Sequence, residues 1–195
     1  VSALLLIVQL LFLKVRVIRA NAEDINERDN GRQLIGCSAG KYLDTTLQYP
    51  RCIACAKGRY SKAGSRGCAS CDKGRYAKKS GSSYCVVCEP GKYQDKSGQS
   101  YCKSCSSGKY QNLWTQTSSS SCKKCPLGRY NNEYSQRWCK ICDKGKYQDK
   151  LGQIYSSSCK QCGAGRYATA AGSRSCSKCA PGKYQDKSGQ DSCND

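Results

Sequence analysis

Large aliphatic side chains are concentrated at the start of this chain and are scarce in the rest of it. Residues 3–13 are all apolar except Gln9. The 159 residues from Cys37 onward, in contrast, contain only ten Ile, Leu or Val. These ten show no helical periodicity. A segment so poor in aliphatic side chains cannot offset its conformational entropy by hydrophobic burial alone. The pattern therefore predicts a fold that is held together by other means.

The local pattern that does recur after residue 36 is a short hairpin. In one copy, residues 92–94 are predicted to be extended, residues 95–98 to form a turn with a left-handed Gly98, and residues 99–102 to return antiparallel. Two copies are three residues longer, and we expect their Ser-rich tips to absorb the insertion.

The hairpins belong to a cysteine repeat, Cys-x-x-Gly-(Lys/Arg)-Tyr, which occurs nine times. A second cysteine closes each copy, and two residues separate it from the next copy. Repeats 1 to 9 span, in order, 37–52, 55–68, 71–85, 88–102, 105–122, 125–139, 142–159, 162–176 and 179–193. They contain all 18 cysteines, a density typical of disulfide scaffolds. We predict a small disulfide-rich fold, a tandem array of nine short β-hairpin units forming an extended rod or shallow solenoid with little hydrophobic core.

Three ways of pairing the cysteines could be shared by all repeats. The bond could lie within a repeat, across the Cys-x-x-Cys between two repeats, or between an opening cysteine and the closing cysteine of a neighbouring repeat. Only the first leaves no unpaired cysteine. We therefore predict the bonds Cys37–Cys52, Cys55–Cys68, Cys71–Cys85, Cys88–Cys102, Cys105–Cys122, Cys125–Cys139, Cys142–Cys159, Cys162–Cys176 and Cys179–Cys193. Each closes a loop of roughly 15 residues, which is worth about 3 kcal/mol in the chain-entropy model. The motif glycine, at the fourth position, is expected to adopt a positive φ, and the tyrosine at the sixth is expected to cover the disulfide.

The N-terminal residues suggest export. Residues 1–22 combine the apolar run with the small-x-small sequence of residues 20–22, which predicts a signal peptide or, alternatively, a signal anchor. Residues 23–36 read as a flexible lead-in. The chain has no Met and stops where a further Cys-x-x-Cys would follow, so we expect the natural sequence to continue at both ends. Because disulfide scaffolds persist in oxidising compartments, we expect a secreted protein or the extracellular face of the cell surface.

Charge offers a candidate binding site. From Cys37 onward the chain carries 28 Lys and Arg against 10 Asp and Glu. One cation follows the motif glycine in every repeat, and we call these nine residues the motif cations: Lys41, Arg59, Arg75, Lys92, Lys109, Arg129, Lys146, Arg166 and Lys183. If the repeats stack in register, the nine line one edge and attract acidic glycans or an anionic membrane surface. The alternative is a solvated face without a partner. Nucleic acid is not expected as a partner outside the cell.

Two other classes of function are weighed against this interpretation. The pairs Cys52-x-x-Cys55 and Cys68-x-x-Cys71 approach the spacing of a four-cysteine zinc site, so a zinc-binding protein is the alternative. An enzyme is not expected, because the chain has no His for nucleophilic catalysis and no recurring pair of carboxylates. No cofactor is expected.

The tandem Cys-x-x-Cys-x-x-Gly-x-Tyr array resembles the ephrin-receptor-like cysteine-rich repeats of the growth-factor-receptor cysteine-rich group. It is also similar to the first half-module of tumour necrosis factor receptor repeats, but the second halves are missing, so their ligands do not carry over. The resemblance covers residues 37–195. It implies a non-enzymatic extracellular spacer or binding surface in a secreted or receptor-like cell-surface protein, with an extracellular protein or an acidic glycan as partner. Membrane attachment would then require the N-terminal segment or a C-terminal part beyond residue 195.

Overall fold

Residues 36–46 and 50–195 are described here in a computed structural model. The predicted leader at 1–22 and all of the predicted lead-in at 23–36 except Gly36 lie outside the described residues. The chain divides into two units. The first comprises the described residues up to Asp72 together with Tyr76–Val86 and Ser97–Tyr101, and the second comprises Lys73–Arg75, Val87–Lys96 and Cys102–Asp195.

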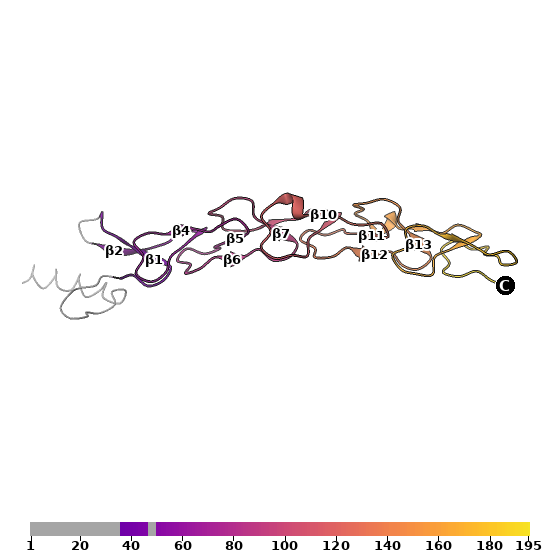
Figure 1. The fold of residues 1–195 in the computed structure, drawn as a ribbon, viewed down its shortest axis with the longest axis horizontal. Helices are drawn as coiled ribbons and strands as arrows, with labels where there is room; N and C mark the ends of the chain where they lie inside the picture. The colour runs from indigo at the N-terminus through magenta and orange to yellow at the C-terminus, as the bar shows by residue number, and fades with distance from the viewer. Residues whose placement is uncertain (1–35, 47–49) are drawn as a thin grey trace, which may run out of the picture. The chain divides into compact units, whose positions relative to one another are not determined.

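The described residues form short strands that lie as separate hairpins along the chain (Figure 1). The strands are β1 (Lys41–Asp44), β2 (Arg51–Ala54), β3 (Arg59–Tyr60), β4 (Ala69–Ser70), β5 (Arg75–Tyr76), β6 (Val86–Val87), β7 (Lys92–Tyr93), β8 (Lys103–Ser104), β9 (Lys109–Tyr110), β10 (Lys123–Lys124), β11 (Arg129–Tyr130), β12 (Lys140–Ile141), β13 (Lys146–Tyr147), β14 (Lys160–Gln161), β15 (Arg166–Tyr167) and β16 (Ser177–Lys178). Each odd-numbered strand pairs with the strand that follows it, in a two-stranded sheet. The predicted tandem array of hairpins with little core is therefore confirmed.

The return strand begins later than the sequence predicts. In repeat 4, Lys92 of β7 lies opposite Ser104 and Tyr93 lies opposite Lys103. Both partners follow Cys102, so the second strand consists of the two residues that separate one repeat from the next. The predicted return over 99–102 is loop instead. The Cys88–Cys102 disulfide of repeat 4 thus ends at the residue immediately before β8.

The loop of each hairpin in repeats 2 to 9 contains a tip residue with a positive φ. In repeats 2 to 9 the tip residues are Gly64, Gly81, Gly98, Thr115, Ser135, Gly152, Gly172 and Gly189, with φ between 59° and 78°. The three extra residues of repeats 5 and 7 are accommodated after the tip, in the 3₁₀ turns η2 (Ser119–Ser121) and η3 (Ser156–Ser158). The insertions therefore lie in Ser-rich segments, as predicted, but these segments follow the tip residues and do not form the tips themselves.

Backbone hydrogen bonds join each repeat to the next by the same pattern within both units. At the junction of repeats 6 and 7, the Gly128 amide donates to the Gln148 carbonyl (2.9 Å) and the Asn131 amide to the Gln153 carbonyl (2.9 Å). The amide of the tip residue Gly152 donates back to the Cys125 carbonyl (2.8 Å). Equivalent bonds recur from repeat 1 onward, so backbone groups connect the repeats where a hydrophobic core is lacking.

Candidate functional site

Nine disulfide bonds close the nine repeats. Each joins the opening and the closing cysteine of one repeat, from Cys37–Cys52 to Cys179–Cys193, over sequence separations of 13 to 17 residues. No cysteine in the described residues is free. The thiolates that the zinc alternative needs are therefore all committed to sulfur–sulfur bonds, and a bonded sulfur is not the ligand that zinc requires.

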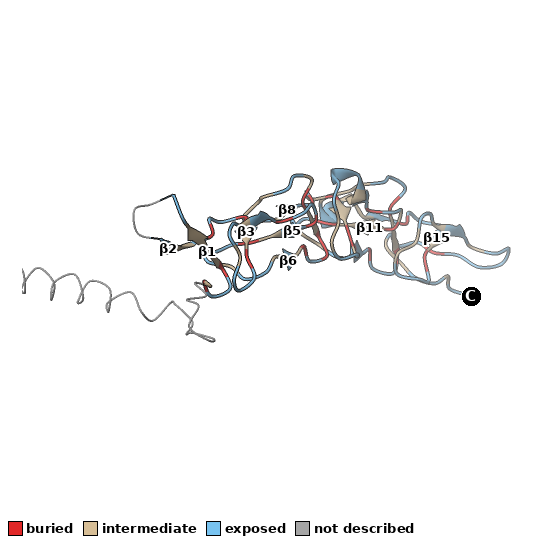
Figure 2. Cartoon of the chain, turned by 60° about the vertical axis from the view of Figure 1, so that its left-hand side comes forward, coloured by how far each residue is buried: buried red, intermediate tan, exposed pale blue. Residues whose placement is uncertain are grey.

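Burial is confined to a few positions of each repeat, which recur along the chain in Figure 2. The opening cysteines of repeats 1 to 8 are buried, and Cys55, Cys88 and Cys125 have no exposed surface. The motif tyrosines, which were expected to cover the disulfides, remain partly exposed in repeats 1 to 8, and Tyr184 is exposed. Large aliphatic side chains are absent from the buried set of the described residues.

The seventh residue of each repeat is the buried position that the sequence analysis missed. In repeats 2 to 9 the seventh residues are Ser61, Ala77, Gln94, Gln111, Asn131, Gln148, Ala168 and Gln185, all at most 6 % exposed. Aligning the repeats on their glycines would have revealed the signal, because every one of these residues is small or carries an amide. A buried amide must find hydrogen-bond partners, and these do.

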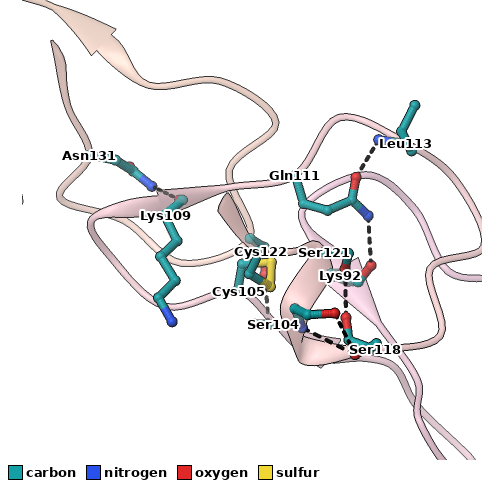
Figure 3. The surroundings of a disulfide bond; sticks show 12 residues. Lys92, Ser104, Cys105, Lys109, Gln111, Leu113, Ser118, Ser121, Cys122 and Asn131 are labelled. Atoms are coloured by element: carbon teal, nitrogen blue, oxygen red, sulfur yellow. Dashed lines mark hydrogen bonds between the residues drawn. A yellow bond between two sulfur atoms is a disulfide. The ribbon is translucent and has the colours of Figure 1, made fainter. Parts of the chain in front are cut away.

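The Asn131 amide shows how the seventh residue connects two repeats. Its Nδ2 donates to the carbonyl of Lys109 in the preceding repeat (2.7 Å), and its Oδ1 accepts from the backbone amide of Glu133 (3.1 Å). Figure 3 shows this contact beside the Cys105–Cys122 disulfide. Gln111 makes the equivalent bond to the carbonyl of Lys92 (3.2 Å). These side chains fix the register between neighbouring repeats.

The motif glycine has a second role besides its positive φ. A Cβ built on Gly128 (φ 75°) would lie 1.9 Å from the carbonyl oxygen of Gly172, the tip residue of the repeat two further along. Gly108 and Gly152 have the same relationship, at 2.5 Å. Each of these glycines therefore makes room for a neighbour two repeats away, which no pattern within one repeat could reveal.

The predicted motif cations lie at the start of the first strand of each hairpin, except that Lys183 lies beyond the last strand. Three of them have acidic neighbours: Lys92 lies 3.9 Å from Glu89, Lys146 lies 3.5 Å from Asp143, and Lys183 lies 2.6 Å from Asp195. The Arg129 guanidinium donates to the Cys139 carbonyl (3.3 Å). Charge along this predicted stripe is thus partly neutralised within the protein, and its role in polyanion binding stays a proposal.

A second set of lysines, at the first position after the closing cysteine, forms ion pairs. Lys160 Nζ lies 2.9 Å from each carboxylate oxygen of Asp149, and Lys103 makes an equivalent pair with Asp95. The hydrogen bond from Lys160 lowers the pKa of Asp149, and the same bond raises the pKa of Lys160. Lys160 also lies 5.5 Å from the centroid of the Tyr147 ring, within the range of a cation–π interaction.

Other kinds of site find little support in residues 36–46 and 50–195. No cluster of His, Cys, Asp and Glu in these ranges has the composition of a metal site. Nor does any helix within them have the length and apolar character needed to cross a membrane. The recurring features of the described chain are its disulfides, its repeat junctions and its surface lysines.

Comparison with known protein families agrees with this architecture. The model of the family described as tyrosine-protein kinase ephrin type A/B receptor-like matches three overlapping segments, residues 74–113, 91–135 and 128–179. Together they cover just over half of the chain. A search of curated proteins gave no significant match. The matched segments lie within the cysteine repeats, and the chain belongs to the ephrin type A/B receptor-like family of cysteine-rich repeats.

Proposed function

We propose that this chain is a non-enzymatic extracellular repeat region that acts as a spacer or binding surface in a secreted or receptor-like cell-surface protein. The observation that carries the proposal is that each repeat is closed by its own disulfide and joined to the next by backbone hydrogen bonds. Disulfide-dense folds of this kind persist in oxidising surroundings. Side chains on the hairpins are correspondingly free to meet partners, because few are needed for a core.

The proposal is tested by expressing the full chain in a secretory cell line. We expect the protein in the medium, with no thiol reacting with a maleimide under denaturing, non-reducing conditions. Retention in the cell with reactive thiols would contradict an extracellular role. Binding of zinc in proportion to those thiols would favour the metal-binding alternative.

Two double variants test the pairing on which the proposal depends. Cys125→Ser/Cys139→Ser removes both ends of one bond, so we expect no free thiol and secretion near the parent level. Cys122→Ser/Cys125→Ser removes the same number of cysteines but leaves Cys105 and Cys139 without partners. We expect two reactive thiols and poorer secretion. Equal behaviour of the two variants would refute pairing within the repeats.

A binder of acidic glycans is the second candidate function. The specific observation in its favour is that no acidic side chain of the described residues forms a salt bridge with Arg59, Arg75, Lys109 or Arg166. Unneutralised cations on an extracellular surface attract polyanions, and the attraction weakens as salt rises. Elution of the purified protein from a heparin column no later than a charge-matched control protein would remove this candidate.

A further inference from the structure

Two hairpins of the second unit place cations directly opposite one another. Lys109 of β9 faces Lys124 of β10, and Arg166 of β15 faces Lys178 of β16. Directly opposite residues of an antiparallel pair project from the same face. We call these the two cation pairs. In the other hairpins of known register the residue opposite the motif cation is uncharged: Ala54, Ser70, Ser104, Ile141 and Gln161.

Neither cation pair is neutralised by the protein. Lys109, Lys124, Arg166 and Lys178 form no salt bridge with any acidic side chain in the described part of the chain. The local sequence explains why, because residues 96–132 and 150–185 contain no Asp or Glu. Each of these acid-free segments contains one cation pair.

Elsewhere in the same array, lysines of the second strand do have acidic partners. Lys103 pairs with Asp95, Lys140 with Glu133, and Lys160 with Asp149. These three lysines lie one residue before the position of Lys124 and Lys178, opposite the motif tyrosine. At the cation pairs no acidic side chain of the described residues forms a salt bridge, although like charges directly opposite one another destabilise a strand pair.

In the Lys109–Lys124 pair, the side chain of Lys124 packs along its stem and Lys109 is half-buried. Gly152 of repeat 7 lies against the aliphatic stem of Lys124, such that a Cβ built on Gly152 would be 3.5 Å from Lys124 Cγ and Cδ. Lys124 nevertheless remains exposed. In Figure 3 the side chain of Lys109 extends away from the hydrogen bonds around the disulfide. The stem is thus held while the ammonium groups remain available to an anion.

We propose that the Lys109–Lys124 and Arg166–Lys178 pairs are anion-binding subsites for the sulfate groups of an extracellular sulfated glycan. The two pairs occupy equivalent positions of repeats 5 and 8. The repeats between them carry one motif cation each, Arg129 and Lys146, and Lys146 lies near Asp143. A linear glycan that carries sulfate groups at intervals can contact several of these cations at once. An isolated small anion can contact only one pair. The choice of a glycan over other polyanions rests on the proposed extracellular function.

The test compares two double variants that remove the same charge from the full-length secreted protein. Lys124→Gln/Lys178→Gln removes one cation from each cation pair. Lys103→Gln/Lys160→Gln removes two lysines that form salt bridges with acidic side chains. We expect the first to weaken binding to a heparin dodecasaccharide about tenfold or more at physiological salt. We also expect it to reduce the slope of log affinity against log salt by about one per lysine. The second should change affinity by less than about threefold, because paired charges release few counterions.

The outcomes separate this inference from the proposed function. Equal loss in both doubles, or no loss in either, would overturn the cation pairs as subsites. A loss seen with phosphatidylserine vesicles or a DNA duplex but not with heparin would overturn the glycan. The conservative double Lys124→Arg/Lys178→Arg should retain heparin binding, and its failure to do so would also count against the assignment. Whether the parent protein is secreted tests the proposed function and, through it, the choice of a glycan, whereas the comparison of the two double variants tests the cation pairs as anion-binding subsites.

Discussion

The carbonyl oxygen of Gly172 lies 1.9 Å from the position that a Cβ on Gly128 would take, although the two glycines belong to repeats 6 and 8. The repeats therefore meet not only their neighbours but also the repeats beyond them. Arrays of this type are usually treated as sums of nearest-neighbour terms. Here a contact of longer range is built from backbone atoms, which have little freedom to move aside.

We predict that Gly128→Ala destabilises its junction more than Gly165→Ala does. Gly165 has a similar φ (72°) but nothing lies within 4 Å of its Cβ position, so its substitution costs only the left-handed conformation, about 1–2 kcal/mol. Gly128→Ala adds a clash with the Gly172 carbonyl. Amide hydrogen exchange measures the effect locally, at the Gly172 amide that donates to Cys142. Equal losses of exchange protection around Gly128 and Gly165 would show that the clash with the Gly172 carbonyl does not add to the destabilisation.

We predict that Thr115→Gly stabilises the protein by about 0.5–1 kcal/mol, because a β-branched residue is strained at positive φ. Thr115 (φ 59°) and Ser135 (φ 60°) are the two tip residues that are not glycine. Ser135→Gly should gain less, because the Ser135 hydroxyl bonds Ser104 Oγ at 2.7 Å. Exchange of the Thr115 amide, which donates to Cys88, provides the measurement, and faster exchange in Thr115→Gly would contradict the prediction.

We predict that removing the Asn131 amide loosens two repeats at once. Asn131→Ala leaves the Lys109 carbonyl and the Glu133 amide without their side-chain partners, at a cost of about 1–3 kcal/mol. Gln148 serves as the control, since its side chain bonds Lys150 and Ser158 of its own repeat. Gln148→Ala should speed exchange in repeat 7 only. If Asn131→Ala leaves repeat 5 unaffected, the side chain does not connect the repeats.

We predict that the Asp149–Lys160 pair stabilises the fold at neutral pH and loses this effect in acid. The Lys160 hydrogen bond lowers the pKa of Asp149 below its ordinary 3.8. Its stabilisation is therefore fully present above the pKa of the unfolded chain and is lost as pH falls through the folded pKa. Lys160→Gln should raise the Asp149 pKa in an NMR titration, and Lys150→Gln should raise it less, because Lys150 acts only through its charge. Equal shifts would assign the effect to net charge instead.

The sequence predicted the repeat, the hairpins and the disulfide-rich class because each is encoded within sixteen to twenty residues. It placed the return strand too early, because it treated Lys103 and Ser104 as a linker, and only their pairing with β7 identifies them as a strand. It did not identify the seventh residue of the repeat as buried. Gln94 is buried completely, where its backbone bonds the repeats before and after its own.

The candidate site was only partly predicted, because some of its features depend on contacts between segments that are distant in the sequence. The motif cations could be found from spacing, and the acids near Lys92 and Lys146 stand three residues before them in the sequence. The opposition of Lys109 and Lys124, in contrast, depends on strand register. Register is set by the whole hairpin. A count of charges along the chain cannot distinguish a lysine that has an acidic neighbour from one that faces another lysine.

The reach of each tip residue to the motif glycine two repeats earlier sets a minimum size for the array. Two repeats contain none of these contacts, three contain one, and each further repeat adds another. Loss of whole repeats would therefore shorten the array without breaking its pattern, whereas a deletion within one repeat would disturb the two before it. Evolution by duplication of complete units is the route that this architecture leaves open.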